Sequence, residues 1–328
     1  MAHYFRLPGL LLTLLAAAPL AQAQEKFVYL TNWYAEAEHG GFYQALASGL
    51  YKKEGLDVTL KMGGPQVNGL QLLAAGQVDC FMGYDVQTMK AREQGIAAVT
   101  VAAAFQKDPQ VMIGHPETVK KIEDLKGKTI LISGDANTNY WPWLRTTFGL
   151  SDSQTRPYTF NIQPFVADKN VVQQGYLSSE PYAIEKQARF KPTVLLLADH
   201  GWPPYTTTVV CMEETIRKKP KAVAAFVKAS MQGWKDYLKG DPKAANALIR
   251  KDNPNMGEDE LLNGIRLLKG TGMVFGGDAA TMGVGIVTDE RMKKTYDMLV
   301  AMKLLDASKV DLKKTYTTQF VKDLKVLP

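Results

Sequence analysis

The chain has 328 residues, of which 46% are hydrophobic and 22% are charged, and its formal net charge is +6. This composition is typical of a globular protein and excludes a disordered chain, and the length allows two compact units. The basic excess is spread along the chain, with its densest cluster at residues 218–221, and no basic stripe alternates with aromatic residues. This pattern is typical of solvated helix ends, so we expect no nucleic-acid partner.

Residues 1–23 have the pattern of a secretory signal peptide. Arg6 is the basic start, residues 10–20 form a short and mostly apolar run, and Ala21-Gln22-Ala23 matches a cleavage signal. The alternative is a buried first helix. The run is too short for a comfortable membrane span, and no later segment reaches about 18 uninterrupted apolar residues. Because no cysteine stands at the cleavage site, we expect a periplasmic protein without a lipid anchor.

From Lys26 onward, apolar strands alternate with amphipathic helices, which is typical of parallel sheets covered by helices. The predicted strands of this first part are 27–31, 58–60, 79–82 and 97–104, and the predicted helices are 41–53, 67–75 and 88–94. The two cysteines, Cys80 and Cys211, lie in apolar strand-like segments and are interpreted as small buried hydrophobic residues. An exported protein would also permit a disulfide, and the sequence leaves open whether these cysteines pair.

A second unit is predicted for residues 114–208, with a strand at 129–132, a helix at about 140–148 and further strand and helix units up to residue 197. The apolar strand 209–212 then returns the chain to the first unit, which comprises 24–113 and 209–328. In the helical C-terminal third, apolar residues after Pro220 recur on one face of a helix. Two units joined by two crossing strands permit hinge closure around a ligand.

Three segments resemble a known family. Residues 42–58 (FYQALASGLYKKEGLDV) and 73–79 (LAAGQVD) resemble the opening lobe of periplasmic solute-binding proteins, in the group named after the yeast thiamin-pyrimidine synthase, and 122–130 (IEDLKGKTI) resemble the entry to the second lobe. The resemblance implies a two-lobed α/β fold of type II, in which each lobe is a mainly parallel sheet flanked by helices and two crossovers form the hinge. It also implies a monomer that delivers a small-molecule ligand to an ABC permease in the inner membrane.

Candidate ligand-binding residues follow the rule that ligands of open α/β sheets lie beyond the carboxyl ends of strands. After the first strand come Asn32, Trp33 and His39, which by resemblance match a segment that contacts the pyrimidine in aminopyrimidine binders. The alternative makes Trp33 a core anchor and His39 a helix cap. After the strand at 79–82, Tyr84 can stack on a flat ligand. Asp85 can accept a hydrogen bond from an amino group, or it caps the next helix.

In the second unit, Ser133, Asn137 and Tyr140 lie in a loop that follows a strand and opens a helix, a position that the family uses, by resemblance, for donors to the ligand. Free amides at a helix N-terminus can hold an anion. The loop has no Lys or Arg, however, and Asp135 would repel a sulfonate. The sequence of this loop therefore favours a neutral or amine-bearing ligand.

Residues 175–182 (GYLSSEPY) resemble a family segment whose glutamate faces the cleft. Glu180 is therefore the strongest polar candidate, since a carboxylate makes charge-assisted hydrogen bonds of about 1.5–3 kcal/mol with amino groups. The alternative is an acidic residue at a helix start before Pro181. Tyr176 and Trp202 complete the candidates, Trp202 as a cleft or hinge residue. Several aromatic side chains at the predicted cleft edges suit a flat, π-rich solute.

No catalytic signature stands out in the sequence. The yeast synthase uses a histidine of its own, a lysine-bound pyridoxal phosphate and a cysteine-rich iron motif, and the aligned stretch 82–88 contains neither histidine nor lysine. The sequence also has no G-x-S-x-G elbow, no P-loop and no H-E-x-x-H motif, and its four histidines are far apart. We expect a non-enzymatic binder with no cofactor and no metal site.

The favoured solute is a thiamin-precursor pyrimidine or a related ring such as a flavin. An aliphatic sulfonate, nitrate or a carboxylated aromatic compound is the alternative ligand. A further alternative, from a different class of function, is a solute sensor that presents itself to a receptor instead of a transporter.

Overall fold

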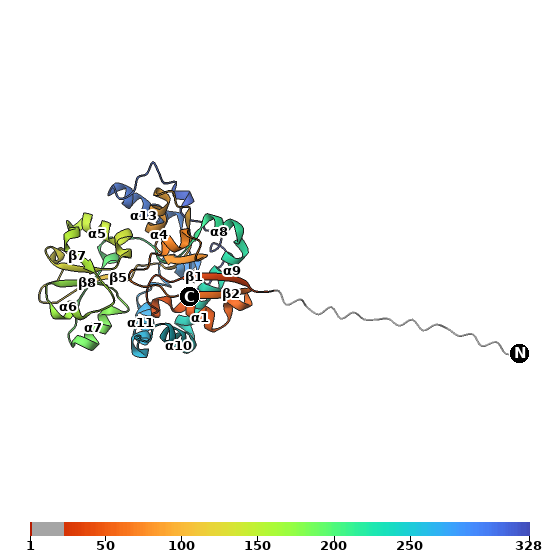
Figure 1. The fold of residues 1–328 in the computed structure, drawn as a ribbon, viewed down its shortest axis with the longest axis horizontal. Coiled ribbons are helices and arrows are strands. Elements are labelled where there is room, and N and C mark those ends of the chain that lie inside the picture. The colour runs from red at the N-terminus through yellow and green to blue at the C-terminus, as the bar shows by residue number, and fades with distance from the viewer. Residues whose placement is uncertain (2–22) are drawn as a thin grey trace.

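The computed structural model describes Met1 and residues 23–328, so the signal-peptide prediction falls on residues outside this part of the chain. The described residues form two lobes, each built on one five-stranded sheet (Figure 1). The two-lobed α/β architecture expected from the sequence is confirmed. Within the described range, no helix combines the length and the apolar character that crossing a membrane requires.

The sheet of the first lobe has the strand order β2-β1-β3-β10-β4. Strand β1 pairs in parallel with β2 and β3, whereas β10 runs antiparallel between β3 and β4. The strands are β1 (Glu25–Leu30), β2 (Leu56–Lys61), β3 (Cys80–Gly83), β4 (Ala98–Phe105) and β10 (Thr206–Met212).

Helices cover both faces of this sheet, because alternate residues of a strand point to opposite sides. Met82 packs into the core beside α1 and α9, whereas Phe81 packs into the smaller core on the other face. Helices α1 and α9 cross closely, since a Cβ atom at Gly233 would overlap the carbonyl oxygen of Gly41. The helices are α1 (Gly40–Ala47), α2 (Leu50–Lys53), α3 (Gly69–Ala74), α4 (Asp85–Glu93), α8 (Glu213–Lys218), α9 (Pro220–Lys239), α10 (Lys243–Asp252), α11 (Glu258–Gly270), α12 (Ala279–Met282) and α13 (Asp289–Ala301).

One helix prediction needs correction. The segment 41–53 was expected to be a single helix, but it is divided into α1 and α2. Gly49 adopts a left-handed backbone conformation between them, with φ of 70°. Glycine takes this conformation without the steric cost that a Cβ atom would impose, so Gly49 ends the first helix and allows the chain to turn.

The second lobe repeats the same plan with the strand order β7-β6-β8-β5-β9. Strand β6 is parallel to β7 and β8, and β5 is antiparallel to β8 and β9. The strands are β5 (Gln110–Gly114), β6 (Thr129–Ile132), β7 (Thr155–Pro157), β8 (Val171–Tyr176) and β9 (Thr193–Leu196), and the helices are α5 (Tyr140–Phe148), α6 (Gln163–Ala167) and α7 (Glu180–Ala188).

The sheets indicate where the chain passes between lobes. Strand β5 belongs to the second sheet, although residues 110–113 were expected in the first unit, and β10 already begins at Thr206 in the first sheet, although 206–208 were expected in the second unit. We therefore propose lobe boundaries in the connecting segments 106–109 and 201–205. Because each of these segments lies between a strand of one sheet and a strand of the other, we propose that the two segments form the hinge.

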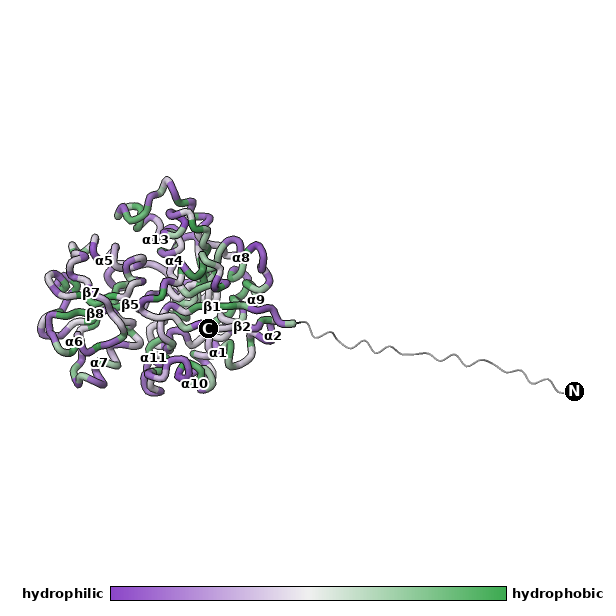
Figure 2. Tube along the Cα trace, viewed as in Figure 1, coloured by the Kyte–Doolittle hydropathy of each residue, from purple (hydrophilic) through white to green (hydrophobic). Residues whose placement is uncertain are grey.

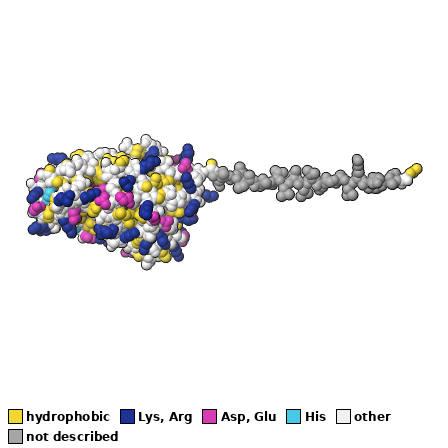
Figure 3. All heavy atoms as spheres, turned by 90° about the horizontal axis from the view of Figure 1, so that it is seen from below, with side chains coloured by type: hydrophobic (Ala, Val, Ile, Leu, Met, Phe, Trp, Pro, Cys, Tyr) yellow, Lys and Arg dark blue, Asp and Glu magenta, His cyan; other side chains and the backbone are white. Residues whose placement is uncertain are grey.

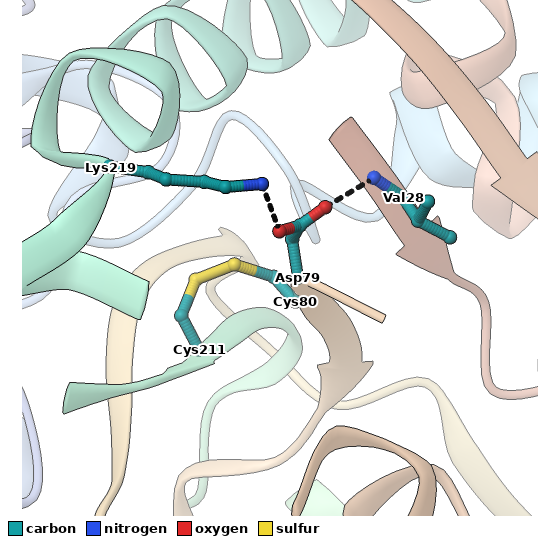
Figure 4. Close-up of a disulfide and its surroundings, with 5 residues drawn as sticks. All are labelled: Val28, Asp79, Cys80, Cys211 and Lys219. Carbon is teal, nitrogen blue, oxygen red and sulfur yellow. Dashed lines mark hydrogen bonds and ion pairs between the residues drawn. A yellow bond between two sulfur atoms is a disulfide. The ribbon is translucent and has the colours of Figure 1, made fainter. Parts of the chain in front are cut away.

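A disulfide joins β3 to β10 in the first lobe. Cys80 and Cys211 face each other in the strand register, with their Cα atoms 4.3 Å apart (Figure 4). The interpretation of these residues as simple buried hydrophobes is therefore replaced by the disulfide that the sequence left open. Beside the bond, Asp79 Oδ2 accepts a hydrogen bond of 2.7 Å from the Val28 amide, and Asp79 Oδ1 pairs with the Lys219 ammonium at 2.8 Å. These contacts tie β1, β3 and the start of α9 together.

Apolar side chains gather in the interior of the two lobes, and hydrophilic side chains lie on the outer helices. The central strands of both lobes are hydrophobic, and outer helices such as α10 carry hydrophilic residues (Figure 2). On the face seen in Figure 3, basic and acidic side chains are interspersed instead of forming a basic stripe. This face therefore offers no continuous track for a phosphate backbone.

Candidate functional site

A pocket lies between the lobes at the carboxyl ends of several parallel strands. Asn32 follows β1, Tyr84 follows β3, Ser133 follows β6 and Tyr176 ends β8. This is the position that the rule for open α/β sheets selects. The first lobe contributes Asn32, Trp33, Glu36 and Tyr84, and the second contributes Gln110, Ser133, Asp135, Asn139, Tyr140, Gln174, Gly175, Tyr176 and Glu180.

The structure brings together seven of the eleven residues that the sequence selected. These are Asn32, Trp33, Tyr84, Ser133, Tyr140, Tyr176 and Glu180. They come from segments separated by as much as 148 positions in the sequence, and both lobes contribute. The other four predicted residues do not line this pocket.

Two of the four lie near the pocket without facing it. His39 is fully buried in a short helical turn, and its Nε2 lies 3.3 Å from Asn32 Oδ1. Burial lowers the pKa of His39 to about 3, so the imidazole is neutral and supports Asn32 instead of forming part of the pocket lining. Asn137 is exposed and bonds through its Nδ2 to the Gly134 carbonyl, 3.2 Å away.

The other two are held in the interior by hydrogen bonds. Asp85 is the first residue of α4 and is fully buried, and its Oδ2 accepts bonds from the Tyr205 amide at 3.2 Å and the Thr295 hydroxyl at 3.1 Å. Trp202 is also buried, and its indole N–H donates to Asp108 Oδ2 at 2.7 Å. Asp85 thus connects α4 to the C-terminal helix α13. Trp202 links the connecting segment 201–205 to the other connecting segment, 106–109.

Aromatic side chains from both lobes line the pocket, namely Trp33, Tyr84, Tyr140 and Tyr176, and Trp33 also contacts two rings outside this lining. Trp33 is half-buried and lies nearly parallel to Tyr158 of the second lobe, with ring centroids 6.1 Å apart and an interplanar angle of 14°. Phe160 meets the edge of the same indole at 6.1 Å. Tyr84 of the first lobe and Tyr176 of the second lobe share a hydrogen bond, with their hydroxyl oxygens 2.6 Å apart. The pocket therefore has flat, π-rich walls, and its tyrosines also carry polar groups.

Amide side chains fix the remaining polar groups of the second lobe. Gln174 Oε1 accepts hydrogen bonds from the Ser133 amide at 2.6 Å and from the Tyr140 hydroxyl at 2.8 Å. Gln110 Nε2 donates to the Gly175 carbonyl at 3.0 Å. These bonds hold the pocket side chains in defined orientations, which reduces the entropy lost when a ligand binds.

Three carboxyl groups lie in the pocket lining. Glu180 stands at the start of α7, where its Oε2 accepts a bond from the Tyr176 amide at 2.8 Å and its Oε1 accepts one from the Tyr158 hydroxyl at 3.2 Å. Removal from water raises the pKa of Glu180 to about 7. The same cause raises the pKa of Asp135 to about 6, although Asp135 accepts a bond from Asn139 Nδ2 at 2.8 Å. Burial is the largest reason that the pKa of Glu36 also lies well above its ordinary value.

The lining contains no basic side chain to balance these acids. None of the thirteen residues that line the pocket is Lys, Arg or His. A buried anion needs a cation or several good donors to offset its lost hydration. The pocket is therefore unfavourable for an anionic ligand, and it favours a ligand that donates hydrogen bonds or carries positive charge.

The lobes contact each other around the pocket. Gln87 Nε2 of the first lobe donates to the Thr138 hydroxyl of the second at 3.2 Å, and Lys186 of the second lobe pairs with Asp259 of the first at 2.7 Å. The cavity volume is about 30 Å³, which is enough for the centres of one or two water molecules. A larger ligand would therefore fit only after the lobes open, and such an opening would require bending in the segments that connect the two lobes.

The comparisons with known proteins agree with this geometry. The described fold is that of the two-lobed periplasmic binding proteins: it superimposes with a TM-score of 0.70 on a structure from Bordetella bronchiseptica RB50, over 92% of this chain and 97% of that one at 15% identity. The alkanesulfonate-binding protein of Xanthomonas axonopodis pv. citri gives a TM-score of 0.63 over 90% of this chain and 98% of that one, at 14% identity. Such identities establish the fold and not the ligand.

The sequence comparison defines the family. The family model described as "NMT1/THI5 like" matches residues 36–245, and the chain belongs to this family. A formylaminopyrimidine-binding protein of Halalkalibacterium halodurans is 22% identical over an alignment of 236 residues, which covers 70% of this chain and 71% of that protein. A 4-amino-5-hydroxymethyl-2-methylpyrimidine phosphate synthase of Saccharomyces cerevisiae is 21% identical over 260 residues, with 69% of this chain and 74% of that protein covered. The relatives thus include both a binding protein and a synthase.

Proposed function

We propose that this protein is the solute-binding component of an ABC importer and that it captures a small, flat, neutral or cationic heteroaromatic solute between its lobes. A thiamin-precursor pyrimidine is the solute that we favour. The observation that carries the proposal is the composition of the pocket lining. It contains aromatic side chains and three carboxyl groups, and it contains no basic residue. The name of the Halalkalibacterium halodurans relative, a formylaminopyrimidine-binding protein, supports the same class of ligand.

The proposed pose uses the pocket groups according to their chemistry. The ring packs between Trp33 on one side and the tyrosine side chains on the other, an arrangement worth about 0.5–1.5 kcal/mol beyond simple burial. Glu180 accepts hydrogen bonds from an exocyclic amino group of the ring. Asn32 and Gln174 also line the pocket, one on each lobe, and in this pose their amides supply the remaining polar contacts.

Closure of the lobes is the step that the ligand controls. Trp33 and Tyr158 lie on different lobes, and so do Tyr84 and Tyr176. A ligand that contacts both members of such pairs binds the closed form more tightly than the open form, and it shifts the population toward closure by this difference in affinity. We propose that the permease in the inner membrane engages the closed form of a periplasmic monomer.

The alternative ligands differ in charge and size. Sulfonate and nitrate are the ligands named for several proteins of the same fold. An anion of either kind would lie beside Glu180 and Asp135 with no ammonium or guanidinium group in the lining. A carboxylated aromatic compound meets the same repulsion.

We also propose a binder instead of an enzyme, although the relatives include synthases. None of the thirteen lining residues is a lysine, cysteine or histidine. The lining therefore offers neither an amine for a Schiff base nor a thiolate or imidazole for nucleophilic catalysis. A receptor in place of a permease remains compatible with the same pocket, and co-purification of the closed protein with membrane components separates the two partners.

Two measurements test the proposal. Native mass spectrometry of the purified protein detects a retained ligand, and a thermal-shift screen then compares aminopyrimidines, flavins, alkanesulfonates and nitrate. We expect a retained mass, or a rise in Tm, with an aminopyrimidine. A ligand at 100 times its Kd stabilises the folded state by about 2.7 kcal/mol, which such a screen detects. A rise in Tm with a sulfonate or nitrate, and none with any ring, overturns the proposal.

A further inference from the structure

The two segments that connect the lobes both contact one side chain of the first lobe, that of Arg291. This residue is the third of α13 and is half-buried. One terminal nitrogen of its guanidinium group donates to Gln106 Oε1 at 3.4 Å, and the other donates to the Pro203 carbonyl at 3.2 Å. The guanidinium carbon also lies 4.0 Å from the centre of the Tyr205 ring, within the range of a cation–π contact. A single side chain thus joins both connecting segments.

The ends of the segments on this side are fixed to the first lobe by further hydrogen bonds. Gln106 Nε2 donates to the Ile286 carbonyl at 3.1 Å, and the Tyr205 amide donates to Asp85 Oδ2 at 3.2 Å. The start of α13 is anchored at the same place, because the Thr288 amide donates to the Tyr205 hydroxyl at 3.2 Å. The guanidinium group therefore reaches from a fixed helix end to two fixed positions of the chain.

The opposite ends of the segments are fixed to the second lobe. The Trp202 indole packs on the indole of Trp143 in α5, with ring centroids 5.1 Å apart, and its N–H donates to Asp108. The Pro109 carbonyl accepts a hydrogen bond of 2.9 Å from the Leu177 amide, which follows β8. Each segment therefore has one end on each lobe.

Bending is thereby confined to two short places. In the first segment, Lys107 lies between Gln106, which is held by the first lobe, and Asp108, which is bonded to Trp202. In the second segment, the change from one lobe to the other falls between Trp202 and Pro203, and the proline ring restricts its own φ angle. Two places of bending define one hinge axis while their spacing is fixed, and the guanidinium contacts fix it on the side of the first lobe.

We propose that Arg291 is a positioning residue for lobe closure, which holds the first-lobe ends of both connecting segments together so that the lobes move about one axis. This inference rests on the closure step of the proposed function, and Arg291 is not part of the pocket lining. Without its contacts the two segments bend independently, and the open form samples more lobe orientations. Closure then loses more conformational entropy, so the apparent affinity for a ligand that binds the closed form falls.

Spin labels on the two lobes test the proposal. The labels are attached through Lys191→Cys on the second lobe and Lys269→Cys on α11, both at exposed positions, and pulsed electron–electron double resonance measures the distribution of distances between them. In the protein without ligand, Arg291→Ala should broaden this distribution. Titration calorimetry with 4-amino-5-hydroxymethyl-2-methylpyrimidine should show binding about 5–30-fold weaker, which corresponds to the backbone freedom of one residue.

Two further variants separate bridging from charge and from general effects on α13. Arg291→Lys keeps the positive charge, but one ammonium group lacks the fork of donors that reaches both segments, so this variant should resemble Arg291→Ala. Lys294→Ala is the matched control, because Lys294 lies one turn further along α13 and lines the same cavity as Arg291. It should change neither the distance distribution nor the affinity.

The outcomes distinguish a role in closure from a role in the fold alone. If Arg291→Ala lowers Tm but leaves the distance distribution and the affinity unchanged, the inference is overturned. Wild-type behaviour of Arg291→Lys overturns it as well, since charge alone then suffices. If the pyrimidine does not bind the wild type, the proposed function fails, whereas the distance distribution without ligand still decides the role of Arg291. If Arg291→Ala does not fold, Arg291→Lys provides the same test.

Discussion

The substitution Glu180→Gln should stabilise the free protein and weaken ligand binding at the same time. Glu180 is 4% exposed, and loss of hydration raises its pKa to about 7 from an ordinary value of 4.5. A glutamine of the same shape accepts the Tyr176 amide bond, and the Tyr158 hydroxyl then accepts a bond from the new amide group instead of donating one. The substitution thus removes a buried charge and keeps the packing.

The sign of the pH dependence follows from the raised pKa. The folded state holds the Glu180 proton more tightly than the unfolded state, so the wild type loses stability as pH rises from about 4.5 to about 7. The full shift corresponds to about 3 kcal/mol, and we expect Glu180→Gln to recover about 1–3 kcal/mol of it at pH 8. Each kcal/mol raises Tm by about 2–4 °C for a domain of this size. Near pH 4, where the carboxyl group is protonated in both states, the difference should vanish.

Differential scanning calorimetry at pH 4 and pH 8 measures the stability, and calorimetric titration with 4-amino-5-hydroxymethyl-2-methylpyrimidine measures the affinity. Loss of the carboxylate should weaken binding by about 1.5–3 kcal/mol, or roughly 10–100-fold. Glu185→Gln, an exposed change on the same helix, is the control and should alter neither quantity. An equal drop in Tm at both pH values, or an unchanged affinity, would refute the assignment of Glu180 as a buried ligand acceptor.

Three further changes probe the pocket, the closure and the fold. Trp33→Ala should weaken ring binding about tenfold or more, because stacking and buried area are both lost; titration calorimetry checks this, and unchanged affinity would remove Trp33 from the site. Tyr84→Phe deletes the 2.6 Å hydrogen bond to Tyr176 and should favour the open form by about 1 kcal/mol, which small-angle scattering detects as a larger radius of gyration; an identical radius speaks against a latch. Replacing both Cys80 and Cys211 by Ala should lower the free energy of unfolding by about 2–4 kcal/mol, and urea unfolding curves that match those of the wild type would contradict that expectation.

The sequence predicts the fold well because the fold depends on local patterns. Alternating apolar and amphipathic segments predict strands and helices whose ends mostly lie within a few residues of those in the structure, and the helix predicted at 140–148 coincides with α5. The disulfide could not be predicted, because Cys80 and Cys211 are 131 positions apart and only the pairing of β3 with β10 brings them together. The division of the helix at 41–53 was missed, since Gly49 was not recognised as its end.

The sequence predicts the pocket residues that lie at the carboxyl end of a strand. Gln110 was missed because β5 is antiparallel, so the start of this strand, and not its end, lies at the pocket. Gln174 was missed because it lies inside β8, where the sequence does not show which face is covered. Asn139 lines the pocket and Asn137 does not, since a short 3-10 turn at Asp135–Thr138 determines which of the two points inward.

Polar residues near a strand end can also turn away from the cleft. His39 and Asp85 are fully buried and held by hydrogen bonds to their own lobe. The sequence offered both a ligand-binding and a structural interpretation for each, and only the tertiary contacts distinguish them. Glu36 lies in the same loop as Trp33 and was not selected. This loop contains two acids, Glu36 and Glu38, and the sequence does not reveal that Glu36 is the one that lines the pocket.

The charge preference of the pocket is the central claim, and direct calorimetric titration with ligands of different charge tests it most directly. The protein is titrated in 0.15 M salt with 4-amino-5-hydroxymethyl-2-methylpyrimidine, and separately with ethanesulfonate and with nitrate. We predict saturable one-to-one binding of the aminopyrimidine and no heat from either anion. Saturable binding of an anion, with no response to the aminopyrimidine, would contradict the account.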